Sequence, residues 1–124
     1  MNERPLSPHL QVYRLPLTAW ISISHRMAGV ILSAGAVFWV VFLMETVRGE
    51  HHYLAIQSLL NSTLGQLALW LWLYVLCFHL CHGVRHLIWD AGHGFRRETL
   101  TRHAAYELLA SVLLILGLFV SGHL

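Results

Sequence analysis

The sequence predicts an all-α membrane protein that crosses the bilayer three times. Of its 124 residues, 56% are hydrophobic and only 11% are charged, which is too apolar for an ordinary soluble domain. Two long uncharged runs and a shorter apolar run near the C-terminus approach the roughly 20 residues that a spanning helix needs. We therefore expect a single membrane-anchor domain over residues 1–124, with helices at approximately 25–48, 63–90 and 104–123.

The first predicted helix is centred on residues 27–44, MAGVILSAGAVFWVVFLM, which contain no formal charge. With their flanks, these residues are long enough to span the membrane. Gly29, Ser33 and Gly35 are small residues that would let a neighbouring helix approach closely. An equally good interpretation is that these small residues face lipid and have no role in helix packing.

The second and third helices follow from two later apolar segments. Residues 64–84 form an uncharged run that is bounded by Arg85 and extends helically to Asp90. Residues 108–122 are short for a span, so the third helix is expected to begin at about Ala104 and to include Glu107. Three helices enclose little space for a cofactor, so we expect them to form part of a hetero-oligomeric helix bundle.

The arginines predict how the chain is oriented. All eight positive charges are arginines, and the formal net charge of +2 is too small and scattered to indicate a nucleic-acid partner. Seven of them lie before the first helix or around the second connection, and one lies in the first connection: Arg4, Arg14, Arg26, Arg85, Arg96, Arg97 and Arg102, against Arg48. The positive-inside rule then places the N-terminus and the second connection in the cytoplasm, and the loop containing His51 and His52 on the far side.

A stripe of histidines marks the second helix as a candidate cofactor site. The segment HLCHGVRHLIWDAG, residues 79–92, concentrates ionisable groups where a membrane helix usually excludes them. At roughly 100° per residue, one stripe contains His79, Gly83, His86 and Asp90, with His82 offset by about 60°. Gly83 removes a side chain one turn from His79, so a flat macrocycle such as haem could lie against the helix. A neutral imidazole is a good iron ligand, and His79 is the deepest candidate in the apolar run.

Simpler interpretations of the histidines compete with haem ligation. A single buried histidine in a membrane bundle is more often a hydrogen-bonding packing group than a metal ligand. The spacing of His79, His82 and His86 would also suit zinc, but no cysteine or carboxylate completes a convincing tetrahedral set. The role of His82 therefore stays open.

The remaining polar residues of this segment have structural explanations. Cys77 and Cys81 are separated by three residues instead of the two of a covalent haem-attachment motif, and are most simply small packing residues. Arg85 and Asp90 could cap or pair at the helix end, where Gly92 and Gly94 are plausible terminators.

Two separated motifs make the sequence resemble the large cytochrome b membrane-anchor subunits of succinate dehydrogenase, respiratory complex II. The first is RPLSPHLQVY at residues 4–13, followed by Ser22-Ile23-Ser24-His25-Arg26. The second is His79-x3-Gly83-x-Arg85-His86-Leu87-x2-Asp90-x-Gly92. The resemblance covers nearly the whole chain. It departs at Ala28, where the family usually has a hydroxyl residue, and this position touches no ligand.

The resemblance implies a haem b shared with a second small membrane-anchor subunit. His79 matches the axial ligand of the family, and the other ligand comes from the partner. Ser22 and Arg26 would help bind ubiquinone, while His25 and Arg26 would lie near the haem propionates. Gly83 and His86 would complete the pocket. Without the resemblance, Arg26 is better explained as an interfacial anchor.

The resemblance also implies the chain's place in an enzyme. It would dock a flavoprotein subunit that oxidises succinate and an iron-sulfur subunit that passes electrons to quinone, and would perform no succinate oxidation itself. The expected location is the bacterial inner (cytoplasmic) membrane. A haem-free structural anchor and the membrane subunit of a fumarate reductase remain alternatives. The arginine distribution puts both motifs near the cytoplasmic end, where they can meet.

Overall fold

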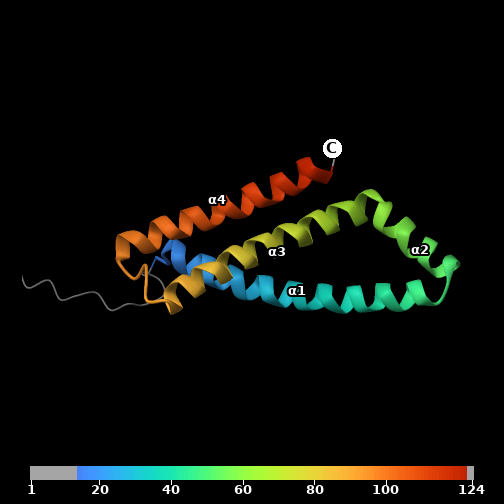
Figure 1. The fold of residues 1–124 in the computed structure, drawn as a ribbon, viewed down its shortest axis with the longest axis horizontal. Coiled ribbons are helices and arrows are strands. Elements are labelled where there is room, and N and C mark those ends of the chain that lie inside the picture. Colours follow the sequence, from blue (N-terminus) through green and yellow to red (C-terminus); the bar gives the residue numbers. More distant parts are fainter. Residues whose placement is uncertain (1–13, 123–124) are drawn as a thin grey trace, which may run out of the picture.

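The computed structural model describes residues 14–122, which form four helices and no strand (Figure 1). The helices are α1 (Leu17–Val47), α2 (Glu50–Asn61), α3 (Thr63–Asp90) and α4 (Arg97–Gly122). Three are long and apolar enough to cross a membrane, namely Leu17–Val47, Thr63–Asp90 and Glu98–Gly122. The predicted all-α fold with three spans is therefore confirmed. The first part of the first motif, residues 4–13, lies outside the described residues, as does residue 123.

The long helices alternate in direction, so three chain segments meet at one end. The start of α1, the end of α3 and the start of α4 lie together, and α2 joins α1 to α3 at the opposite end (Figure 1). This arrangement brings His25 and Arg26, near the start of α1, to the same end as the histidines of α3. The two sequence motifs can therefore contribute to one site.

Two of the long helices begin earlier than expected. Helix α1 starts at Leu17 rather than near residue 25, and the carbonyl of Pro16 accepts a hydrogen bond from Ala19 N at 3.0 Å. Helix α4 starts at Arg97 rather than near Ala104. The extension of α4 over residues 97–103 is polar apart from Leu100, so hydropathy does not detect it. The extension of α1 over residues 17–24 is mostly apolar but precedes the uncharged run 27–44 on which the prediction was centred. In both places the helix continues because its backbone hydrogen bonds can form. Helix α3 occupies the same residues, 63–90, as expected.

The first connection, expected to be a loop, is mostly the short helix α2. Gly49, with φ of 120°, separates it from α1, and Glu50 lies in its first turn, where a negative charge favours the helix dipole. Ser62 then caps α3, because its side-chain oxygen accepts a hydrogen bond from Gly65 N at 3.1 Å. The apolar spacing of Tyr53, Ile56 and Leu60 was a sequence signal for this helix.

The end of α3 is formed by left-handed glycines. Gly92 and Gly94 have φ of 82° and 84°, a conformation that L side chains rarely adopt. The carbonyls of the last turn are satisfied locally, since Ala91 N donates to Leu87 O at 3.0 Å and His93 N to Ile88 O at 3.1 Å. The prediction that these two glycines terminate the helix is confirmed.

Small residues of α1 let α3 approach closely. A Cβ placed on Gly35 would overlap the Trp72 indole, and one placed on Gly29 would lie 3.4 Å from Cε1 of His79. For these two glycines the structure therefore favours the helix-contact interpretation over the lipid-facing one. Ser33 differs, because its side chain is exposed and its hydroxyl donates to Gly29 O at 2.8 Å.

The packed core is small, and much apolar surface is left open. The core consists of Ile21, Ala28, Phe78 and Ala104, with Val75 and Leu108 packed against it. Large apolar side chains point outward from every long helix, including Val30 and Leu71, each 66% exposed, and Leu113, 58% exposed. In a bilayer such surfaces contact lipid or further helices, because neither leaves apolar groups in water.

Candidate functional site

Four histidines from two helices form the polar centre of the protein. His25 of α1 stacks on His79 of α3 with ring centroids 4.1 Å apart, and its ring also lies 4.1 Å from that of His82 and 5.8 Å from that of His86. The rings of His82 and His86 are 4.8 Å apart. We call these four residues the histidine cluster. Since His25 belongs to the first motif and the others to the second, the expected meeting of the two motifs is observed.

His79 is a half-buried imidazole with unused hydrogen-bonding capacity. Its Nδ1 atom is buried and has no hydrogen-bond partner among the described residues. A Cβ added at Gly83, one turn further along α3, would meet no atom of another side chain or helix within 4 Å. The surface beside His79 is therefore open at Gly83, while Gly29 closes it from the side of α1.

His82 is held quite differently, by a buried carboxylate. Its side chain is 1% exposed, and its Nδ1 lies 2.6 Å from Oε1 of Glu107 in α4. The guanidinium of Arg85 donates to the other carboxylate oxygen, Oε2, at 2.9 Å. We call His82, Arg85 and Glu107 the Glu107 network. It ties α3 to α4 through charge-assisted hydrogen bonds in a region that excludes water.

The structure corrects the partner expected for Arg85. Its guanidinium binds Glu107 rather than Asp90, donates to the carbonyl of Leu100 at 3.4 Å and lies 4.5 Å from the centre of the Trp89 ring. Asp90 is exposed and forms no ion pair within residues 14–122. The helical rotation explains the difference, because Arg85 and Asp90 are five residues apart and point to different sides of α3.

The three histidines best placed to share a metal ion differ from those weighed for zinc in the sequence. One ring nitrogen from each of His25, His82 and His86 lies within 4.8 Å of the other two. His79 is not part of this group, and His25 from the neighbouring helix replaces it. Contacts between helices, and not spacing along one helix, therefore determine the geometry of the cluster.

The candidate quinone residues lie near the start of α1. Ser22 is half-buried and Arg26 is exposed, and neither side chain hydrogen-bonds to another residue between 14 and 122. Ser22 and Gly29 are seven residues apart, which places them about 20° apart around the helix. Because Gly29 faces His79, the stripe that begins at Ser22 leads toward the histidine cluster.

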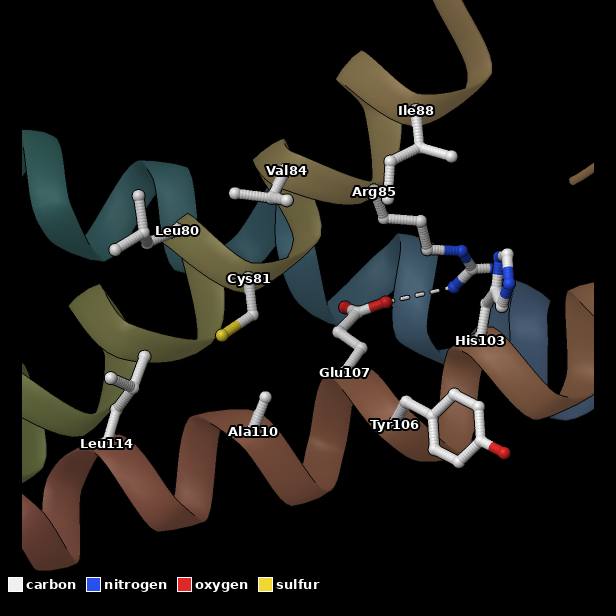
Figure 2. A pocket seen from close by; sticks show the side chains of 10 residues that line it. All are labelled: Leu80, Cys81, Val84, Arg85, Ile88, His103, Tyr106, Glu107, Ala110 and Leu114. Atoms are coloured by element: carbon white, nitrogen blue, oxygen red, sulfur yellow. Dashed lines mark hydrogen bonds and ion pairs between the residues drawn. The ribbon is translucent and has the colours of Figure 1, made fainter. Parts of the chain in front are cut away.

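Two grooves flank this region. A groove of about 410 Å³ between α1 and α3 is lined by Ser24 rather than Ser22, together with Trp20, Met27 and Tyr74. A second groove, of about 380 Å³, lies between α3 and α4. Figure 2 shows Glu107 projecting from α4 toward Arg85 in this second groove, with aliphatic side chains of both helices beside them.

The fold and the cluster define a multi-pass helical membrane protein whose first and second spans present imidazoles to a common site. Residues 1–118 match the family of succinate dehydrogenase/fumarate reductase transmembrane subunits. The chain belongs to this family, and the resemblance drawn from the two motifs is confirmed. It is therefore a transmembrane subunit of this class of oxidoreductase.

Relatives from bacteria and from mitochondria align over most of the chain. The succinate dehydrogenase cytochrome b556 subunit of Paracoccus denitrificans is 40% identical over 113 residues, covering 91% of this chain and 87% of the relative. The corresponding subunit of Rickettsia prowazekii is 34% identical over 123 residues, covering 96% and 93%. The mitochondrial cytochrome b560 subunit of Sus scrofa is 39% identical over 119 residues, covering 94% and 70%.

Proposed function

We propose that this chain is the haem b-binding membrane anchor of a succinate:ubiquinone oxidoreductase. It docks the flavoprotein and iron-sulfur subunits and forms part of the site where quinone is reduced, while succinate is oxidised in the flavoprotein. The observation that carries the proposal is the half-buried His79 imidazole, with its unpartnered Nδ1, beside the open surface at Gly83. The relatives named cytochrome b556 and b560 support the same cofactor class.

The residues around His79 fit a haem. Imidazole nitrogen is a common axial donor to haem iron, and the missing side chain at Gly83 leaves room for a flat ring close to α3. His25, His86 and Arg26 would supply donors to the propionates. When bound, haem b provides a one-electron carrier. The apolar faces of the three spans are exposed and can pack against further helices. A second small anchor subunit would therefore cover the haem and supply its second axial ligand.

Ser22 and Arg26 are proposed to bind the ubiquinone headgroup. They lie at i and i+4 on α1, so one headgroup can reach both side chains. Arg26 presents planar N–H donors and Ser22 a hydroxyl, which suit the carbonyl oxygens of a quinone. Reduction of one ubiquinone takes two electrons from the iron-sulfur subunit and two protons. Donors at the two oxygens stabilise the negative charge that develops there.

The proposed location is a bacterial inner membrane, with the N-terminus in the cytoplasm. Arginines concentrate at the end where α3 stops and α4 begins, whereas the far end has only Arg48. In a background with Cys77 and Cys81 replaced by alanine, a membrane-impermeant thiol reagent added outside should label His51→Cys but not Arg96→Cys in intact cells. Permeabilised cells, in which both positions should react, provide the control. Outside labelling of position 96 alone would reverse the orientation.

Purification of the tagged chain from its own membranes tests the proposed function. We expect a flavoprotein, an iron-sulfur protein and a second small membrane protein to copurify with it, and the reduced complex to show a b-type haem spectrum. The same partners without haem would favour the haem-free anchor. Fumarate reduction much faster than succinate oxidation would favour the fumarate reductase alternative. Absence of these partners would refute the proposal.

A further inference from the structure

Glu107 lies outside the family motifs, yet it binds Arg85 of the second motif and His82 of the histidine cluster directly. We propose that Glu107 is a positioning residue for the cofactor site: through His82 it fixes an imidazole of the cluster, and its charge sets the electrostatic potential of the haem pocket. This inference rests on the proposed function. It concerns an acidic residue of the third span, to which neither motif assigns a role.

Glu107 determines the hydrogen-bonding state of His82. Its side chain is 5% exposed, and both carboxylate oxygens are occupied, one by Arg85 and one by His82. A carboxylate paired with a guanidinium is an acceptor, so Nδ1 of His82 must carry the proton that it donates. In the neutral imidazole, Nε2 is then left with a free lone pair. The same pattern, a carboxylate holding one imidazole nitrogen so that the other is available, is used to orient histidines at metal centres.

The orientation of His82 passes to the rest of the cluster through ring contacts. The His82 ring lies against His25, and His25 stacks on His79, with both centroid separations equal to 4.1 Å. His82 is 1% exposed, so its ring has little room to turn. A change at Glu107 therefore reaches the proposed haem ligand through two packed rings, without contact between Glu107 and the cofactor.

The charge of Glu107 also balances a buried cation. Arg85 is 4% exposed, and its only acidic partner among residues 14–122 is Glu107. Figure 2 shows the pair in the groove between α3 and α4, whose lining is mostly apolar, and the burial of both side chains reduces screening by water. Neutralising Glu107 would leave Arg85 uncompensated beside His86. A positive potential there stabilises the reduced haem, so the midpoint potential should rise.

The Glu107→Gln variant tests this inference in the purified complex. Glutamine keeps the shape and an acceptor oxygen but removes the charge. We expect the haem content and subunit ratio of the wild-type complex, with a higher haem midpoint potential and a shifted low-spin spectrum. Glu98→Gln is the matched control, because Glu98 is an exposed acid in the first turn of α4. This variant should leave the haem midpoint potential and the low-spin spectrum unchanged. Glu107→Asp retains the charge and should restore the potential at least in part.

The possible outcomes separate this inference from the function on which it rests. Wild-type potential and spectrum in a haem-loaded Glu107→Gln complex would overturn the positioning role and leave the proposed function intact. Absence of haem from the wild-type complex would overturn both. If the Glu107→Gln complex does not assemble, the His82→Gln variant tests the positioning role instead, since the Arg85–Glu107 pair remains in that variant. A shifted spectrum with haem retained supports the role, and an unchanged one refutes it.

Discussion

Replacement of His79 by alanine is expected to remove the low-spin haem spectrum from the assembled complex. The imidazole is the proposed axial ligand, and no other described side chain combines its half-buried position with the open surface at Gly83. Loss of an axial ligand removes the low-spin state even where some haem stays trapped in the pocket. The measurement is the reduced-minus-oxidised spectrum, together with haem per flavin in the purified complex.

His82→Ala is the matched control for this prediction. It removes an imidazole from the same helix and the same cluster, but one whose Nδ1 is already engaged by Glu107. We expect it to shift the haem spectrum and not to abolish it. An unchanged spectrum in an assembled His79→Ala complex would exclude His79 as ligand and direct attention to His82 or His86. Added imidazole should partly restore the low-spin spectrum of His79→Ala if only the ligand has been lost.

The three membrane-spanning helices were predictable because each contains a long apolar segment. The second span contains the uncharged run 64–84 and ends just before Gly92 and Gly94, and both features are local. The start of α1 at Leu17 was missed because the prediction was centred on the uncharged run 27–44, although residues 17–24 are themselves mostly apolar. Helix α2 was missed because it spans no membrane, although its apolar spacing was readable.

The histidine cluster was predictable only in part, because it depends on contacts between helices. The spacing of His79 and His86 along α3 is fixed by the helical repeat, so their shared face follows from the sequence. Their contact with His25 requires α1 to approach α3, which the small residues Gly29 and Gly35 permit but do not dictate. The family resemblance supplied the information that the residues alone did not.

The pairing of Glu107 with His82 and Arg85 could not be read from local pattern. Glu107 is 25 residues from His82, and the contact depends on how α3 and α4 rotate against each other. The sequence did indicate that Glu107 has a partner inside the protein, because an acidic residue within a membrane span requires one. Arg85 was instead compared with Asp90, its nearest acid along the chain. In the structure the closer partner in space lies on the next helix.

The second large effect is expected at quinone: Ser22→Ala should slow quinone reduction by about one to two orders of magnitude. A hydrogen bond to a charged or developing oxyanion contributes roughly 1 to 3 kcal/mol, and about 1.4 kcal/mol corresponds to a tenfold change in rate. Succinate oxidation with an artificial acceptor should persist, because that chemistry is proposed to occur in the flavoprotein. Both reactions are assayed on the same membranes, with haem content and subunit abundance measured in parallel.

Ser33→Ala is the matched control for Ser22→Ala, because both serines belong to α1 and the Ser33 hydroxyl is already committed to the carbonyl of Gly29. Its quinone kinetics should equal those of the wild type. Equal losses of quinone reduction and artificial-acceptor activity in Ser22→Ala would instead indicate a damaged complex and defeat the assignment.

Arg26→Lys sharpens the comparison, because lysine keeps the positive charge and lacks the planar fork of guanidinium. If that variant reduces quinone at the wild-type rate, charge alone suffices and Arg26 is an interfacial anchor; if it is slowed like Ser22→Ala, the two side chains act on the same headgroup.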